Sequence, residues 1–551
     1  MNNENSLAKP FKVEFSSKQR KVGSYNKNII YVWPTEDGWN DFKYKTHGLF
    51  VVKLEDDQVI SGNILIAVQD QSENDDISYS GLGNQITSIS DKNEKADFFF
   101  SLLPSIGEYR NIVRDVGVPM ASKILNSLND LVYTNEQEKD AHWLEAAQNS
   151  EVFQKSFMRN SEPFFAFYNA GDILKGLDFE NLDYISNTLN LKFKLDGFLN
   201  EHELELRFGN SDLVPKRINI LIGENGLGKS QSLNHFVRAA LQQRQYIDEL
   251  IDPTSESKRP MISRLLAIGT PGETTNTYPT DSIKNPKLHY RRLLLTRNSR
   301  SKASRTVGKS IIQLARMDDS ISNLERWDIF IEAISSTLPI DKLKVPLEKA
   351  FEGRKSVSLK KLRSGWNEER RLQIWSNIAD NAEPTIAGQD GEYPLSSGQL
   401  SFFKFALLAC LHIENGSFVL LDEPETHLHP SMISDFITLL DNILERTGSY
   451  ALIATHSTYF VREVAREQVH VFKRFNNDEI QILNPRLKTF GANIGDISHF
   501  VFDEDYGNSL SQKVITRANI ENLSYKDIKK KYGSILPTEM LQNIKVELVS
   551  Q

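Results

Sequence analysis

Short runs of alternating hydrophobic and polar residues characterise the first part of the chain. They predict strands near residues 29–33, 49–54 and 60–68, separated by polar turns. The tract 69–95 is rich in Asp, Ser, Asn and Gly, which predicts a mobile loop. From residue 112 to about residue 186 the pattern is more helical. We therefore expect an accessory region over residues 1–186 that is first β-rich and then helical.

Later in the chain the hydrophobic pattern changes to that of a buried sheet. Period-two alternation over residues 191–208 is assigned to the first strands of the main sheet. Three further runs, at residues 218–222, 418–421 and 450–454, are almost continuously apolar, as in parallel strands buried on both faces. An apolar helix is expected over residues 402–413. Together these elements predict an α/β domain.

The first apolar run leads into the pattern G-x-x-x-x-G-K-S at residues 223–230, and a helical pattern follows. In this strand–loop–helix context the glycines let successive backbone N–H groups point inward, and the helix N-terminus adds partial positive charge. Lys229 would reach the β- and γ-phosphates of ATP, and the Ser230 hydroxyl would bind Mg²⁺. A glycine-rich turn before an ordinary helix is the alternative. The candidate ATP-binding residues are Gly223, Asn225, Gly226, Gly228, Lys229, Ser230 and Gln231.

The second apolar run ends in two adjacent carboxylates, Asp422 and Glu423. A buried parallel strand would deliver both to the carboxyl edge of the sheet, where open α/β sheets bind ligands. Asp422 suits the Mg²⁺ shell together with Ser230, and Glu423 suits activation of the attacking water. On its own, such a pair could also be a solvated acidic turn.

Small polar residues precede the apolar helix: Ser396, Ser397, Gly398 and Gln399. At a helix N-terminus they can cap the helix or bind an anion. Their place shortly before the strand that ends at Asp422 favours the anion site.

In this order, these motifs resemble the ABC-type ATPase heads of SMC proteins and of their DNA-repair relatives. The resemblance implies that residues 396–399 of one subunit contact ATP held by another, in trans, so that ATP joins two heads. It also implies that His456, which follows the third apolar run, contacts the γ-phosphate as a catalytic residue beside Glu423. Ser397 stands where the commonest signature has glycine. The glutamine loop is expected after residues 293–296.

The resemblance predicts the fold class: an ABC-type head with a P-loop, a mixed sheet and a helical insertion, after a β-rich N-terminal accessory region. The head would span residues 187–500, with the insertion at about 245–390, and residues 501–551 would form a helical tail. The insertion carries no sustained apolar heptads and several prolines, so a long coiled coil is excluded. Its helices are expected near residues 311–334 and 359–380.

Composition narrows the class of protein. The chain has 551 residues, 39% of them hydrophobic, and a net charge of −8, so it has no global basic field for nucleic acid. The single cysteine, Cys410, excludes a disulfide framework and indicates a reducing compartment. The N-terminus has no signal-peptide pattern, and the longest apolar run is too short to span a membrane. We therefore expect a cytoplasmic protein without membrane contact.

One segment of the insertion is strongly basic. Between residues 284 and 309 the chain has nine Lys or Arg residues and no acidic residue. They could form a solvated face, lie near the bound triphosphate, or contact the phosphate backbone of a nucleic acid. The candidate nucleic-acid contacts are Arg291, Arg292, Arg297, Arg300, Lys302 and Arg305.

The chain after His456 is short, and its acids cluster at Asp503, Glu504 and Asp505 instead of being spaced as in a nuclease domain. Residues 523–551 predict one or two terminal helices.

An ATPase without an output domain needs a partner. The whole pattern is similar to PtuA, the ATPase of Septu-type anti-phage systems, found alone or attached to retrons. That resemblance implies a separate HNH nuclease (PtuB-like) and, in retron-linked systems, a reverse transcriptase with its msDNA. A DNA-repair ATPase acting on DNA ends and a transporter subunit are the alternatives.

Overall fold

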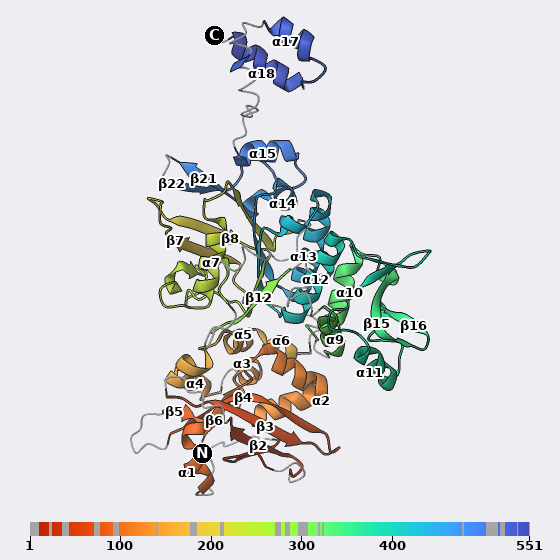
Figure 1. Ribbon diagram of the computed structural model, residues 1–551. Helices are drawn as coiled ribbons and strands as arrows, with labels where there is room; N and C mark the ends of the chain where they lie inside the picture. Colours follow the sequence, from red (N-terminus) through yellow and green to blue (C-terminus); the bar gives the residue numbers. More distant parts are fainter. Residues whose placement is uncertain are drawn as a thin grey trace.

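The computed structural model shows an N-terminal region, a central head, an insertion beside the head and a C-terminal helical pair (Figure 1). The residues that it describes are 10–20, 25–35, 43–70, 78–91, 98–138, 141–176, 185–209, 214–269, 277–280, 287–295, 307–317, 320–321, 324–475, 479–502, 516–517, 524–536 and 538–549.

The N-terminal region is built on one sheet with strand order β1-β2-β3-β4-β5, in which β6 also pairs with β4. Its strands are β1 (Lys12–Phe15), β2 (Ile29–Pro34), β3 (His47–Lys53), β4 (Val59–Gln69), β5 (Tyr79–Gly81) and β6 (Phe99–Leu102). The three strands predicted here are confirmed as β2, β3 and β4. The polar tract 69–95 also contains β5 and helix α1 (Leu82–Asp91), while its residues 71–77 and 92–95 lie outside the described residues.

Helices cover one face of this sheet (Figure 1), and they confirm that the chain after residue 112 is largely helical. They are α2 (Ile106–Ser127), α3 (Leu131–Gln137), α4 (Leu144–Asn149), α5 (Ser161–Asn169) and α6 (Gly171–Leu174), with a π-helical turn at Phe153–Phe157. The N-cap Ser105 accepts a hydrogen bond from the backbone N–H of Glu108 and thereby satisfies one of the free donors at the start of α2.

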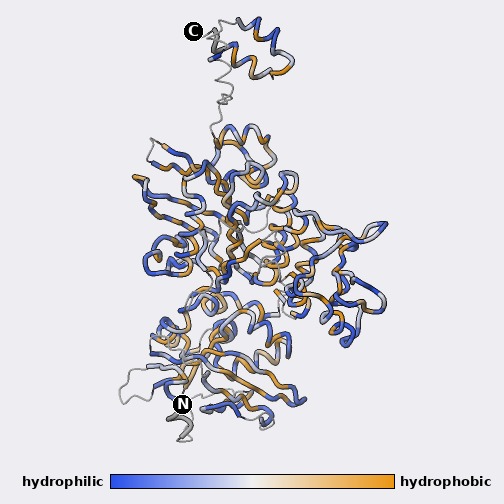
Figure 2. The backbone as a smooth tube through the Cα atoms, viewed as in Figure 1, coloured by the Kyte–Doolittle hydropathy of each residue, from blue (hydrophilic) through white to orange (hydrophobic). Residues whose placement is uncertain are grey.

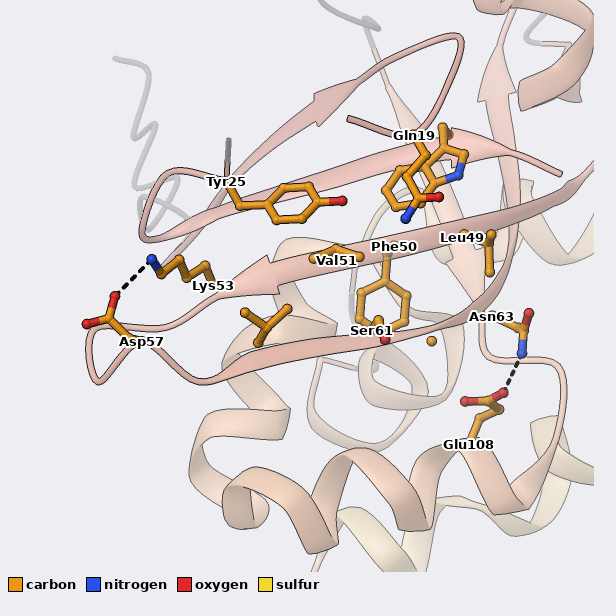
Figure 3. Close-up of a pocket in the computed structure, with 13 residues that line it drawn as sticks. Gln19, Tyr25, Leu49, Phe50, Val51, Lys53, Asp57, Ser61, Asn63 and Glu108 are labelled. Atoms are coloured by element: carbon orange, nitrogen blue, oxygen red, sulfur yellow. Dashed lines mark hydrogen bonds and ion pairs between the residues drawn. The ribbon is translucent and has the colours of Figure 1, made fainter. Parts of the chain in front are cut away.

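The opposite face of the sheet carries a groove of about 690 Å³ (Figure 3). Buried Tyr25 and Trp33 and half-exposed Val59 lie along it. An ion pair between Lys53 and Asp57 (2.9 Å) closes one end, and a hydrogen bond from Asn63 Nδ2 to Glu108 Oε1 (2.8 Å) lies at the other.

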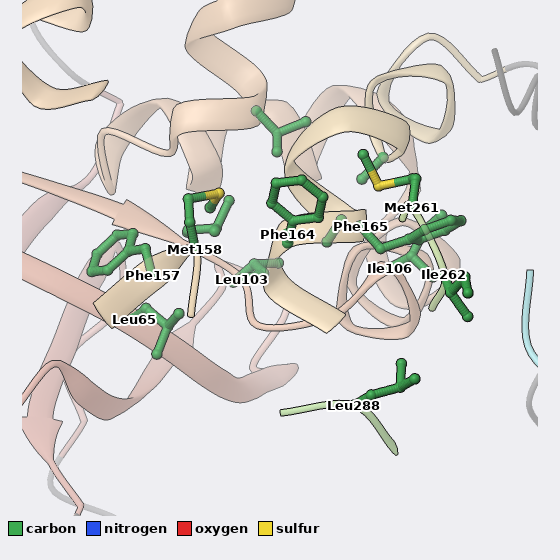
Figure 4. Packing of buried hydrophobic residues seen from close by; sticks show 14 of the residues in the cluster. Leu65, Leu103, Ile106, Phe157, Met158, Phe164, Phe165, Met261, Ile262 and Leu288 are labelled. Carbon is green, nitrogen blue, oxygen red and sulfur yellow. The ribbon is translucent and has the colours of Figure 1, made fainter. Parts of the chain in front are cut away.

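The N-terminal region and the head share one hydrophobic core. Phe164 and Phe165 of α5 pack with Ile106 of α2 and with Met261 and Ile262, which precede the head strand at Arg264–Gly269 (Figure 4). Because this apolar surface is continuous, the accessory region is part of one packed body with the head.

The head is an α/β domain, as predicted. Its main sheet has the strand order β12-β11-β19-β20-β9-β21-β22, parallel except for the antiparallel edge strand β22. The strands are β9 (Ile218–Gly223), β11 (Arg264–Gly269), β12 (His289–Leu294), β19 (Phe418–Asp422), β20 (Tyr450–Thr455), β21 (Val469–Phe475) and β22 (Glu479–Leu483).

Apolar residues of this sheet point alternately into two cores. Leu221 and Leu420 face one core with helix α7 (Lys229–Ala240), whereas Ile222 and Leu421 face the other with α12 (Ser397–His412) and α13 (Ile433–Thr447). Burial on both faces explains why these strands are continuously apolar. Figure 2 shows the resulting hydrophobic centre of the head, with hydrophilic residues along its periphery.

The assignment of residues 191–208 to the main sheet was wrong. Strands β7 (Thr188–Phe193) and β8 (His202–Arg207) form a separate antiparallel sheet with β10 (Leu250–Ile251). Buried and exposed residues alternate along β8, so this sheet has one solvated face. The period-two pattern is that of a half-buried sheet, whereas the central strands of the main sheet are buried on both faces.

The insertion is not purely helical, which corrects the prediction. It contains α9 (Val307–Arg316), α10 (Arg326–Ser335) and α11 (Glu368–Ser376). It also contains an antiparallel sheet, β16-β15-β17-β18, formed by Leu343–Phe351 (β15), Arg354–Ser358 (β16), Thr385–Ala387 (β17) and Glu392–Pro394 (β18). Much of β15 and all of β18 are at least partly exposed, so their hydrophobic pattern was too weak to identify strands.

Helix α14 (Thr458–Arg462) lies between β20 and β21, and after the main sheet come α15 (Ile494–Phe502), α17 (Tyr525–Tyr532) and α18 (Thr538–Val549). The last two form their own small apolar cluster and confirm the predicted terminal helices. Asp503, Glu504 and Asp505 lie outside the described residues. In the described part of the chain, every helix is too short or too polar to cross a membrane.

Candidate nucleotide-binding site

The site lies at the carboxyl edge of the main sheet. Strand β20 lies between β9 and β19, pairing Thr455 with Ile222 and Ala454 with Asp422. Because these strands are parallel, their carboxyl ends meet at one edge. The phosphate-loop pattern, the two adjacent carboxylates and His456 are therefore brought together by three neighbouring strands.

The phosphate-loop pattern connects β9 to α7 and needs its glycines for two different reasons. A Cβ atom on Gly223 would collide with the carbonyl oxygen of Phe472 on β21. Gly228 has φ +95°, and a Cβ there would lie 2.9 Å from His202 Nε2. The first glycine permits close packing of backbone, and the second permits the left-handed turn that starts α7.

Lys229 is buried, and its ammonium curls back onto the loop. Nζ donates to the carbonyl oxygens of Gly223 (2.9 Å) and Glu224 (2.8 Å). Burial lowers the pKa of Lys229 to about 8, although the nearby carboxylates of Glu423 and Asp422 oppose this shift. A bound polyphosphate would supply the negative charge that this buried cation lacks.

Ser230 and Asp422 meet as expected for a magnesium site. Ser230 Oγ donates to Asp422 Oδ1 at 2.9 Å. A third residue joins them, because Thr277 Oγ1 donates to Asp422 Oδ2 at 2.7 Å. Among the described residues no group of three His, Cys, Asp or Glu side chains could hold a metal. One carboxylate, one hydroxyl, phosphate oxygens and water form the kind of oxygen shell that Mg²⁺ takes, so these residues fit Mg²⁺.

Glu423 and His456 lie side by side. Glu423 Oε1 is 3.3 Å from His456 Nε2, and both side chains are partly exposed. Glu423 has φ +46°, an uncommon conformation for a residue other than glycine, and its N–H donates to the carbonyl of Ala454 on β20. The backbone therefore turns sharply just after β19 and places this carboxylate beside the histidine.

Glu425 also belongs to the site, although the sequence motifs did not identify it as a site residue. Its Oε1 accepts a hydrogen bond from the backbone N–H of His456 at 2.7 Å. Burial raises the pKa of Glu425, while the hydrogen bond from His456 opposes the shift. Glu425 thus fixes the turn that carries His456.

Residues 396–399 form the first turn of α12 and are capped as a helix. Ser396 Oγ accepts from the N–H of Gln399, and Gln399 Oε1 accepts from the N–H of Ser396 at 3.0 Å. Ser396 and Ser397 are exposed, whereas Gly398 packs so closely on Met432 that a Cβ atom would lie 2.6 Å from its sulfur. Asn225 and Gln231 of the phosphate-loop region are also exposed.

The six basic residues that are candidate nucleic-acid contacts do not share one environment. Arg291 on β12 is exposed, but Arg292 Nη1 donates to the carbonyl of Tyr278 at 3.2 Å. The other four, Arg297, Arg300, Lys302 and Arg305, lie outside the described residues.

The expected position of the glutamine loop, after residues 293–296, runs from the end of β12 into undescribed residues. Strand β11 separates β12 from β19. The segment that reaches Asp422 follows β11 instead and contains Thr277. A single hydroxyl residue without a surrounding pattern gives no sequence signal, so Thr277 could not be found from the sequence.

Comparison with known proteins agrees with this geometry. A family model described as an AAA domain, putative AbiEii toxin, Type IV TA system matches residues 282–462, which include Asp422, Glu423 and His456. Residues 282–462 are thus similar to an AAA domain.

This chain is 24% identical over 543 residues to protein ea59 of Escherichia phage lambda, covering 96% of each chain. The SMC head domain from Thermotoga maritima overlaps 55% of this chain and 100% of its own at 13% identity, with a TM-score of 0.28. The ADP conformation of MJ1267, an ATP-binding cassette of an ABC transporter, overlaps 58% of this chain and 96% of its own at 11% identity, with a TM-score of 0.27.

Proposed function

We propose that this protein binds and hydrolyses ATP with Mg²⁺, and that two copies of the head join around the nucleotide. The observation that carries the proposal is the meeting of Lys229, the Ser230–Asp422 pair and the Glu423–His456 pair at one sheet edge. Each of these groups matches one requirement of phosphoryl transfer: a cation, a metal site and a base for water.

Each of these residues has a different role in the proposed reaction. Ser230 and Asp422 would hold Mg²⁺, and the ion would neutralise phosphate charge. Glu423 accepts the proton of the attacking water, and His456, 3.3 Å away, orients this carboxylate and donates toward the phosphate. Lys229 exchanges its two carbonyl partners for phosphate oxygens.

The proposed trans contact rests on the exposed N-terminus of α12. Ser396 and Ser397 face solvent at the start of a long helix, where free backbone N–H groups and the helix dipole attract anions. In the single chain the backbone N–H groups of Ser396 and Gln399 each donate to the side chain of the other residue, so these N–H groups can exchange that acceptor for phosphate oxygens held by a second head.

The test is the oligomeric state of Glu423→Gln, which removes the base but keeps the shape of the side chain. With ATP and Mg²⁺ we expect this variant to bind ATP and accumulate as a dimer by light scattering. Ser397→Arg in the same background should remain a monomer while still binding ATP, because the bulk lies outside its own site. An unchanged monomer for Glu423→Gln with bound ATP would refute the trans contact.

We further propose that this ATPase regulates or scaffolds an anti-phage defence complex with a separate HNH nuclease similar to PtuB, and, in retron-linked systems, with a reverse transcriptase and its msDNA. The PtuA-like motif order and the toxin–antitoxin description of the matching family model support this role. Exposed Arg291 favours a second candidate, a DNA-repair ATPase acting on DNA ends.

One purification separates the two candidates. Tagged Glu423→Gln protein is isolated from its native host, and the bound proteins and nucleic acids are identified. A small HNH protein in the complex supports the defence role. Duplex DNA ends without a nuclease, together with strong stimulation of wild-type ATP hydrolysis by DNA, would favour the repair role.

A further inference from the structure

Both carboxylate oxygens of Asp422 accept a hydroxyl hydrogen bond from a different part of the chain. Ser230, on α7, donates to Oδ1, and Thr277, after β11, donates to Oδ2. Thr277 and Asp422 are each only 5% exposed. Water therefore competes weakly for these bonds, and the carboxylate is held from both sides.

The backbone around Thr277 is itself fixed by three side chains. Asn234 Nδ2 on α7 donates to the carbonyl of Thr277 at 2.8 Å. On β12, Arg292 donates to the carbonyl of Tyr278 (3.2 Å) and the Tyr290 hydroxyl donates to the carbonyl of Pro279 (2.8 Å). The segment 277–279 is thus held between the helix that follows the phosphate loop and the strand that carries the basic candidates.

From this geometry we propose that Thr277 is a positioning residue for Mg²⁺, acting through Asp422. The proposal rests on the proposed ATPase function and assigns a residue to its metal site. When Ser230 turns its oxygen toward the metal, the hydrogen bond from its hydroxyl to Asp422 Oδ1 is lost. Thr277 still donates to Oδ2 and helps to keep the plane of the carboxylate fixed. Such supporting bonds orient a ligand and set how tightly the metal is held.

The substitution Thr277→Val removes the hydroxyl but keeps the size and branching of the side chain. Binding of a fluorescent ATP analogue is measured with and without Mg²⁺. We expect the Mg²⁺ concentration for half-maximal enhancement of binding to rise about 10- to 100-fold. The affinity without metal should stay within about twofold of wild type, because the described hydrogen bonds of Thr277 run to Asp422 and Asn234, which lie outside the phosphate loop.

Two matched variants test the assignment. Thr277→Ser restores a hydroxyl and should return the Mg²⁺ dependence to near wild type. Thr438→Val removes an exposed hydroxyl from α13, whose bond runs to the carbonyl of Ser434, and should change nothing. If Thr277→Val does not fold, Thr277→Ala carries the same expectation with a smaller side chain.

Two results would overturn the proposal. One is a wild-type Mg²⁺ dependence in Thr277→Val. The other is an equal loss of affinity with and without metal, which would mark Thr277 as a purely structural residue. Failure of the ATPase function itself is distinguishable, since wild-type protein would then show no Mg²⁺-dependent ATP binding at all.

Discussion

The buried ammonium of Lys229 predicts that ATP affinity falls between pH 7 and pH 9.5, below the range in which an exposed lysine titrates. Its pKa is held at about 8 by burial, against an ordinary value of 10.5. The difference corresponds to about 3 kcal/mol favouring the neutral amine. Bound ATP reverses this balance, because the ammonium then faces several phosphate oxygens.

The magnitude follows from the fraction of charged lysine in the free protein. With a pKa of about 8, this fraction falls from about 90% at pH 7 to about 10% at pH 9. If bound ATP keeps Lys229 protonated throughout, the apparent affinity falls about tenfold between these pH values. Above pH 9 it should fall about tenfold for each further pH unit, until the pKa of the bound state is reached.

The assay is the dissociation constant of Mg-ATP, measured by fluorescence titration at constant ionic strength from pH 7 to pH 9.5. Lys229→Arg is the control, because a guanidinium stays charged over this range. Its affinity can be weaker overall, but its pH profile should be flat. A flat profile for wild-type protein would refute the reasoning, and so would a slope shared by both proteins.

Two further predictions concern stability and loop geometry. Burial would raise the pKa of Glu414, but the charges of Arg110 and Arg326 outweigh it and hold the pKa at about 2. Glu414→Gln should therefore cost about 3 kcal/mol in urea denaturation at pH 7, and this deficit should shrink as the pH falls from 4.5 toward 2, since the ion pairs of the wild type are lost there. A deficit that does not change with pH would contradict this account. Gly223→Ala should weaken ATP binding at least tenfold in equilibrium dialysis because its Cβ collides with backbone, whereas at Gly226 the space is open and only the left-handed φ of +79° strains Ala, so the loss there should be smaller. Equal losses at the two glycines would argue against a steric cause.

The control for the charge prediction is Glu205→Gln. Glu205 is an exposed partner of Arg207, and such surface pairs contribute less than about 1 kcal/mol. The large difference expected between the two glutamates comes from desolvation: the buried arginines beside Glu414 have no water to replace the lost carboxylate.

The features that the sequence determined are local ones. Residues 223–230 needed only their own spacing and the flanking apolar run to predict a phosphate loop, and Asp422 and Glu423 needed only the strand before them. Continuous apolar runs identified strands buried on both faces, because a polar side chain on either face of such a strand needs a buried partner, as Asn219 and His470 have in each other. The start of α12 was likewise visible from its small polar residues.

The tertiary structure decided which residues that are far apart in the sequence contact one another. Thr277 meets Asp422 across 145 residues, and Arg110 meets Glu414 across 304. In the folded chain β11 lies beside β19, β7 and β8 form a separate sheet with β10, and the insertion contains a further sheet. A hydrophobic pattern records which side of a strand or helix is buried, but it does not record which other element buries it. These partners are selected by packing among many apolar faces of similar composition, so only the folded chain reveals them.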